Sequence, residues 1–412
     1  MQMVGKDKRI TIFLSRIKAL VAKGGGIERI NLHLAEELLR RGYQVDLVLC
    51  RSDPQSRALV PPGIRVIVLP RVSRRRAKWA AFQASRGLRW QLLRPVLLAL
   101  HPTTELRHLP GFIDYVETHK PDAVISAFVQ INLVALLTKR ASRHRFKLLV
   151  EQQGPWSRML GPEAAGSWRW RHLPPLLSRL YAEADAVVPV SEGIAEHLRQ
   201  VAGLPDTVLR TIHNPVIDEQ SRHRRDEPLT HPWFAPGEPP VILNVGRLDR
   251  QKDQATLLRA FARLRAKRPA RLMILGEGGE RARLEALAQE LGIADDVALP
   301  GFVANPLPYM REAAVFALSS LYEGLPTVLI EALFCGCPVV STDCVSGPRE
   351  ILEDGRYGHL VPVGDDAALA EALAATLTHP PDRQVLTQSV QGRGFTVAEA
   401  TERYLQAMQL SA

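Results

Sequence analysis

The chain has 412 residues, 46% of them hydrophobic, and a formal net charge of +10. This length exceeds what one ordinary hydrophobic core organises, so we expect two domains. No apolar stretch approaches the roughly 20 residues of a membrane span, and the N-terminal segment does not resemble a signal peptide, which together indicate a soluble or peripheral protein. The cysteines show no metal-ligand spacing and fit small buried residues in a reducing cytoplasm.

Residues 1–213 are predicted to form an α/β domain. Apolar runs of strand length alternate there with helical patterns, which is typical of a parallel sheet. Ligands bind beyond the carboxyl ends of such strands, so site residues are expected there. The predicted strands are 10–14, 44–49, 66–69, 123–126, 147–151, 186–190 and 208–212.

The glycine-rich turn Gly24-Gly25-Gly26 follows the first predicted strand and opens a helix. Glycines let a backbone approach a ligand closely, and a helix N-terminus favours negative charge. The pattern is neither Gly-x-Gly-x-x-Gly nor a Walker loop. It indicates either a phosphate contact or a flexible turn.

The positive charge is concentrated in the first half, where residues 1–215 hold 33 Lys and Arg against 17 Asp and Glu. Its densest part is 71–100, which contains no acid and interleaves cations with aromatic and aliphatic residues. Such a helix can lie on an anionic membrane surface, and a solvated helix packed on its own domain is the alternative. Nucleic acid is less favoured, because no nucleic-acid-binding motif accompanies the charge.

Residues 214–240 are predicted to be a linker, because prolines cluster there with charged residues. A second α/β domain follows at 241–394, with strands predicted at 241–245, 271–275, 297–299, 314–318 and 338–341. Two open parallel sheets that face each other would place a ligand in the cleft between them.

Arg247 and Lys252 follow the strand 241–245 and the turn at Gly246. Arginine offers a planar fork for phosphate oxygens and lysine a mobile point charge, so the pair can neutralise a diphosphate leaving group. Two solvated surface cations are the alternative. Their position just past a strand end favours a ligand.

The segment 320–333 carries the strongest functional signal. Glu323 lies in a loop before an apolar run, and Glu331 lies inside the helix that this run predicts. Pro326 stands early in that helix, where N–H groups are free to meet an anion. Carboxylates suit hydroxyl groups and a helix N-terminus suits phosphate, so the segment indicates a sugar nucleotide.

With these motifs in this order, the chain resembles the retaining, nucleotide-sugar-dependent glycosyltransferases of family 4, the group 1 glycosyltransferases. The resemblance implies the GT-B fold, in which two Rossmann-like domains face each other across a cleft, with a C-terminal helix at about 395–412 packed on the first domain. The matching segments are 24–29, 190–193, 213–216, 246–252, 275–278, 299–302, 323–331 and 343–352.

The resemblance also implies roles for single residues. Arg247 and Lys252 would hold the donor diphosphate, Glu331 the ribose and Glu323 the transferred sugar. The other donor contacts would come from Gly25, Gly26, Gly246, Phe302, Val303, Leu325, Pro326, Thr327 and Val328. No divalent metal or other cofactor is implied, and the sequence has no Asp-x-Asp metal motif.

One position departs from the family pattern. Many relatives carry a histidine after the strand that corresponds to 147–150, whereas this chain has Glu151 and Gln152. Gln152 cannot accept a proton as imidazole can, but it could orient the acceptor or the donor sugar. Glu151 would then be the nearest base. The alternative is that both are polar residues of a strand end.

The sequence therefore predicts a retaining transferase that moves a sugar, from a UDP-sugar, to a hydroxyl of a glycan or polyprenyl-linked acceptor. We expect it to act in bacterial capsule or lipopolysaccharide synthesis, in the cytoplasm or on the inner face of the membrane through 71–100. A GDP-mannose donor is one alternative, because the identified residues contact phosphate and ribose rather than the base. An inactive sugar-nucleotide-binding protein is another, suggested by Gln152. Nucleic acid is not an expected partner.

Overall fold

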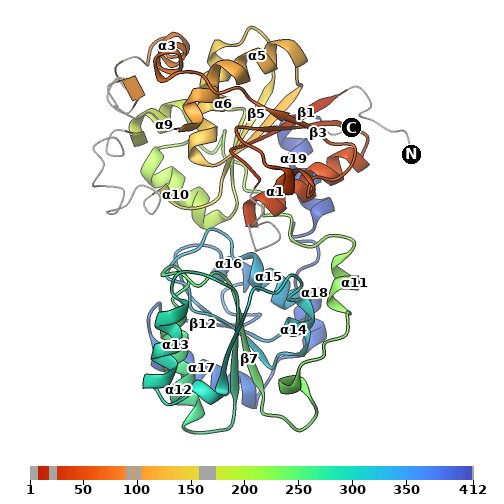
Figure 1. Ribbon diagram of the computed structural model, residues 1–412, viewed down its shortest axis with the longest axis vertical. Coiled ribbons are helices and arrows are strands. Elements are labelled where there is room, and N and C mark those ends of the chain that lie inside the picture. The colour runs from red at the N-terminus through yellow and green to blue at the C-terminus, as the bar shows by residue number, and fades with distance from the viewer. Residues whose placement is uncertain are drawn as a thin grey trace. The chain divides into compact units, whose positions relative to one another are not determined.

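A computed structural model describes residues 8–17, 26–88, 90, 96–97, 104–156 and 173–410 of the chain (Figure 1). The described residues form two compact units. The first contains those up to 213 together with 397–410, and the second contains 214–396. Each unit has one sheet of six parallel strands with helices packed on it, which confirms the predicted pair of Rossmann-like α/β domains.

The first unit has the strand order β3-β2-β1-β4-β5-β6. Its central strands are buried along nearly their whole length, which explains why their sequences are continuous apolar runs. The predicted strand at 208–212 forms only a single bridge, between Leu209 and Val187. The strands are β1 (Arg9–Leu14), β2 (Gln44–Leu49), β3 (Arg65–Val68), β4 (Ala123–Ala127), β5 (Lys147–Gln152) and β6 (Ala186–Pro189).

The described helices of the first unit include the C-terminal helix α19 (Val397–Met408), which lies beside α1 (Gly26–Arg40) (Figure 1). Tyr404 and Leu405 of α19 join the core around β1, and Arg41 forms an ion pair with Glu402 at 2.7 Å. The other helices are α2 (Pro54–Arg57), α3 (Arg74–Ala84), η3 (Thr104–His108), α5 (Leu109–His119), α6 (Val129–Ala141), α9 (Leu173–Tyr181) and α10 (Glu192–Ala202).

The second unit repeats this topology with the strand order β12-β11-β10-β7-β8-β9. Its strands are β7 (Val241–Val245), β8 (Arg271–Leu275), β9 (Val297–Gly301), β10 (Val315–Leu318), β11 (Val339–Thr342) and β12 (His359–Val361). Its helices include α12 (Gln254–Arg265), α13 (Arg281–Glu290), η6 (Ala294–Asp296), α14 (Leu307–Glu312), α15 (Thr327–Phe334), α16 (Pro348–Ile351), α17 (Asp366–Thr378) and α18 (Arg383–Gln388). The sequence did not predict the edge strand β12, which is only 3 residues long.

Residues 214–240, expected to lack regular structure, contain the helix α11 (Ser221–Arg225) and the 3-10 turn η5 (Pro232–Phe234). Distant side chains hold this segment to the second unit. Asn305 Nδ2 donates to the carbonyl of Arg224 at 2.8 Å, and Arg311 Nη1 donates to that of Arg225 at 2.9 Å. Local proline content could not reveal these contacts.

Candidate functional site

Each sheet reverses its strand order at one place, between β1 and β4 in the first unit and between β7 and β10 in the second. The loops that leave two such strands diverge, so a crevice opens beyond their carboxyl ends. Several predicted site residues fall on the loops of the second unit. Arg247 and Lys252 follow β7, and Glu323 follows β10.

Lys252 and Glu323 meet at this point of the sheet. Lys252 Nζ lies 2.6 Å from Glu323 Oε1, and the two side chains are 15% and 8% exposed. Ser320 Oγ donates to the same oxygen at 2.6 Å. Among the described residues no group donates to Oε2 of Glu323, so this oxygen is available to a ligand hydroxyl. A half-buried cation and a free oxygen of a buried carboxylate thus lie side by side.

Hydrogen bonds to backbone carbonyls fix the loop after β7 and the loop after β10 against each other. Leu321 N donates to the carbonyl of Gln251 at 2.8 Å, and Gln251 Nε2 donates to that of Tyr322 at 2.9 Å. Ser319 Oγ donates to the carbonyl of Lys252, also at 2.9 Å. These bonds hold the backbone next to Lys252 and next to Glu323. The positions of both residues are therefore set before any ligand binds.

The turn after β8 packs directly on the turn after β7, and glycine makes this approach possible. A Cβ atom at Gly276, where φ is +151°, would lie 1.9 Å from the carbonyl oxygen of Gly246. A Cβ atom at Gly278 would lie 2.1 Å from that of Leu248. These glycines therefore position the loop that carries Arg247 and Lys252.

The helix α15 begins at Thr327, so Pro326 immediately precedes the helix rather than standing early within it as predicted, and no side-chain hydrogen bond caps the helix. Its first-turn amides, starting at Thr327, can therefore meet an anion. Glu331 is buried in the second turn. The loop after β11 supports the start of the helix, because Ser346 Oγ donates to the carbonyl of Gly324 at 2.8 Å.

The remaining predicted donor residues are less tightly placed. Arg247 is largely exposed and pairs with Asp249 at 3.1 Å, apart from the Lys252–Glu323 pair. Phe302 and Val303 follow β9 and are half-buried. Gly26 opens α1 with no atom near its Cβ position, and Gly25 lies outside the described residues. The phosphate, base and loop contacts predicted for these residues stay predictions.

Glu151 is the penultimate residue of β5, and its carboxylate is enclosed. Tyr404 Oη donates to Oε1 at 2.7 Å, while the amides of Gln153 and Asn31 donate to Oε2 at 3.0 and 3.3 Å. Burial raises the pKa of the Glu151 carboxyl, and the three hydrogen bonds only partly oppose this. These contacts tie β5 to α1 and α19. They favour the structural interpretation of Glu151 over that of a catalytic base.

Gln152 is also buried and held by its neighbours. Its Oε1 accepts hydrogen bonds from Trp156 Nε1 at 3.0 Å and from Tyr181 Oη at 3.3 Å, and its Nε2 donates to the carbonyl of Gly154. The side chain therefore shapes the turn after β5. This again supports the strand-end alternative.

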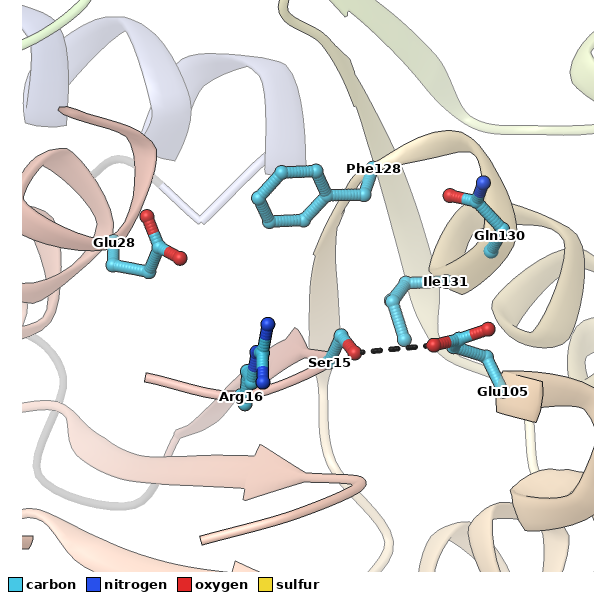
Figure 2. Close-up of a pocket in the computed structure, with 7 residues that line it drawn as sticks. All are labelled: Ser15, Arg16, Glu28, Glu105, Phe128, Gln130 and Ile131. Carbon is cyan, nitrogen blue, oxygen red and sulfur yellow. Dashed lines mark hydrogen bonds between the residues drawn. The ribbon is translucent and has the colours of Figure 1, made fainter. Parts of the chain in front are cut away.

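A pocket of about 240 Å³ opens at the β1–β4 reversal of the first unit (Figure 2). None of its side chains was predicted as a site residue. The signals in the sequence were their positions after β1 and near the start of α6, and Glu28 within the motif 24–29. The lining residues are Ser15, Arg16, Glu28, Glu105, Phe128, Gln130 and Ile131.

In the part of the chain that the structure describes, no helix has both the length and the hydrophobicity that a membrane span needs. Within the same ranges, no three His, Cys, Asp or Glu side chains are grouped as metal ligands would be.

Two family models match the chain. Residues 227–393 match the model described as glycosyl transferases group 1, and residues 25–215 match the glycosyl transferase 4-like domain. The two matches fall on the second and first units respectively. They cover the loops that carry Lys252 and Glu323 as well as the pocket residues from Glu28 onwards.

Curated relatives align over part of their length. An N-acetylgalactosamine-N,N'-diacetylbacillosaminyl-diphospho-undecaprenol 4-alpha-N-acetylgalactosaminyltransferase of Campylobacter jejuni is 38% identical over 49% of this chain and 53% of its own. The lipopolysaccharide core biosynthesis glycosyltransferase LpsE of Rhizobium meliloti is 29% identical over 58% of this chain and 68% of its own. The chain thus spans about half the length of the first of these relatives.

Solved structures match over nearly the full length. A glycosyltransferase from Rickettsia africae has a TM-score of 0.74 at 14% identity and covers 98% of both chains. HepE from Anabaena in complex with UDP has a TM-score of 0.72 at 19% identity, over 98% of this chain and 99% of its own. At these identities the likeness concerns the fold, and it confirms the predicted GT-B class.

Proposed function

The chain belongs to the group 1 glycosyltransferases, and from this membership we propose that it transfers a sugar from a nucleotide sugar to an acceptor hydroxyl. The observation that carries the proposal is the Lys252–Glu323 pair, in which a half-buried cation and a free oxygen of a buried carboxylate lie where the loops after β7 and β10 diverge. The acceptor would be a glycan or lipid-linked glycan of a cell-surface polysaccharide. Relatives named for lipopolysaccharide core and diphospho-undecaprenol glycans support this.

In the proposed reaction, Lys252 stabilises the nucleoside diphosphate as the bond between the sugar and its phosphate breaks. A fixed cation is most effective where charge develops, and the uncapped start of α15 would add to it. The free Oε2 of Glu323 would accept a hydrogen bond from a hydroxyl of the transferred sugar. Arg247 would contact the diphosphate and Glu331 the ribose, and no divalent metal is part of this scheme.

We propose that the configuration at the anomeric carbon is retained. The acceptor oxygen would attack on the face that the phosphate leaves, and the departing phosphate oxygen would take the acceptor proton. This step needs no protein base. It is therefore compatible with the enclosed carboxylate of Glu151 and with Gln152 in place of a histidine.

The donor is proposed to be a UDP-sugar, which the likeness to a UDP-bound structure supports. A thermal-shift screen of UDP, GDP and their sugars tests this. A ligand at 100 times its Kd stabilises a protein by about 2.7 kcal/mol, which corresponds to a rise of roughly 5–10 °C in Tm for a unit of this size. We expect such a rise with UDP and little with GDP. A larger rise in Tm with GDP than with UDP would indicate a GDP-sugar donor. No rise in Tm with either nucleotide would reject the nucleotide-sugar proposal.

We further propose that the first unit binds an anionic membrane through a basic surface, defined as the described residues between Arg71 and Trp90. Trp79 and Trp90 are 60% and 83% exposed there, and Trp79 stacks on Phe82. Exposed aromatic rings beside cations suit a headgroup layer. The exposed cations are Arg71, Arg74, Arg75, Arg76 and Arg86.

Co-sedimentation with vesicles tests this surface. We expect binding to phosphatidylglycerol vesicles at low salt and release at 1 M salt, because the Debye length falls from about 10 Å at 0.1 M to about 3 Å at 1 M. Reversing Arg74, Arg75 and Arg76 to Glu should abolish binding, since each basic residue near such a surface contributes about 1 kcal/mol. Reversing Arg263, Arg283 and Arg356 of the second unit is the control. Equal binding by both triple variants would contradict the assignment.

A further inference from the structure

The pocket at the β1–β4 reversal of the first unit contains a buried carboxylate without a partner. Glu28, on α1, is 6% exposed and lines the pocket. Within the described residues it forms no hydrogen bond or ion pair, and Figure 2 shows its carboxylate directed into the open space. Burying an unpaired carboxylate is costly, so its position suggests that a bound molecule completes its hydrogen bonds.

The other walls of the pocket provide complementary groups. Glu105 lies across from Glu28 and receives only a long hydrogen bond from Ser15 Oγ, at 3.4 Å (Figure 2). Arg16 is exposed at the rim and has no partner among the described residues. Phe128 has a φ of 78°, and this uncommon backbone conformation presents its ring at the edge of the pocket (Figure 2).

The size and chemistry of the pocket indicate one sugar ring. Its volume of about 240 Å³ lies below the range of about 300–1,000 Å³ that holds drug-sized ligands, so it suits a smaller molecule. Two carboxylates can accept hydrogen bonds from hydroxyl groups, Gln130 can donate or accept, and an aromatic ring offers an apolar face. These are the groups that a polyhydroxylated ring needs on its different sides.

We propose that this pocket binds the terminal sugar of the acceptor and selects a neutral ring over a uronic acid. The proposal rests on the proposed function, because it assigns the pocket to the acceptor of that reaction. Glu28 and Glu105 accept hydrogen bonds from hydroxyl groups of a neutral ring. The carboxylate of a uronic acid would meet two carboxylates, one of them buried, and a like charge in a site shielded from water is strongly disfavoured. Arg16 lies at the exposed rim, where solvent weakens its compensation.

Ligand-observed NMR measures this preference. The probes are pairs of methyl hexopyranosides and methyl hexuronosides of the gluco, galacto and manno series, which differ only at C6. With UDP present, we expect wild-type protein to bind the neutral member of at least one pair about tenfold or more tightly, a ratio that corresponds to 1.4 kcal/mol. Glu28→Gln should reduce the ratio to within about threefold, because it removes the buried charge and keeps the shape.

Glu196→Gln is the matched control, since this carboxylate lies on α10 of the same unit, outside the pocket, and should leave the ratio unchanged. Equal binding of both members by wild type, binding of neither, or an unchanged ratio in Glu28→Gln would overturn the proposal. UDP binding is measured in the same samples by thermal shift. Loss of the UDP signal with an intact sugar preference would reject the donor proposal alone.

Discussion

Glu323→Gln is expected to lower the rate of sugar transfer by about 100- to 1,000-fold, the loss typical when one preorganised electrostatic contact to a transition state is removed. The amide keeps the shape of the side chain and can still accept the hydrogen bond from Ser320. It removes the negative charge that faces Lys252 and the carboxylate oxygen that is available to the sugar. Quantitation of the glycosylated product by mass spectrometry measures the effect.

Binding of UDP separates this explanation from misfolding. Because Glu323 is assigned to the transferred sugar rather than to the nucleotide, UDP should bind the variant with an affinity within about threefold of wild type, less than 1 kcal/mol. Glu290→Gln is the control. It replaces an exposed carboxylate on α13 of the same unit and is expected to keep full activity. Wild-type turnover by Glu323→Gln would remove this residue from the site.

Lys252→Ala is expected to reduce transfer by at least a similar factor and, unlike Glu323→Gln, to weaken UDP binding. The lysine is the half-buried cation that pairs with Glu323, and in the proposed reaction the diphosphate gains charge as the bond to the sugar breaks. Its removal also leaves Glu323 buried without its cation, which can destabilise a protein by about 3–5 kcal/mol. Thermal melts must therefore accompany the assay.

Lys252→Gln gives a second test that preserves folding more fully, because its amide can still donate a hydrogen bond to Glu323. It lacks the positive charge, so we expect it to be inactive with a Tm closer to that of wild type. Lys267→Ala, an exposed lysine variant of the same unit, should be fully active. An active Lys252→Gln variant would show that the charge at this position is dispensable.

The positions of Lys252, Glu323 and the start of α15 could be predicted from the sequence because they follow strand ends within short segments, whereas their donor contacts stay predictions. The pairing of Lys252 with Glu323 could not, since 71 residues separate them and the contact depends on the adjacency of β7 and β10. The same limit applies to Glu151. Its place at a strand end is local information, whereas the hydrogen bond from Tyr404 spans 253 residues.

The pocket of the first unit was missed for a related reason. Its residues come from separate segments around β1, α1, η3 and α6, and no single segment has an unusual composition. At the level of the fold, apolar runs located the central strands well. They missed the edge strand β12, which is very short, and they overpredicted 208–212, which forms one bridge only, because pairing at these places is decided by neighbours rather than by local pattern.

Release of UDP coupled to sugar transfer is the measurement that tests the central claim most directly. Wild-type protein, a panel of UDP-sugars and lipid-linked glycan acceptors should yield UDP and glycosylated acceptor in equal amounts for one donor. Lys252→Ala should yield neither. Transfer that continues unchanged in Lys252→Ala, or a wild-type protein that binds UDP-sugars and never releases UDP with any acceptor, would contradict the assignment of this chain as a nucleotide-sugar-dependent transferase.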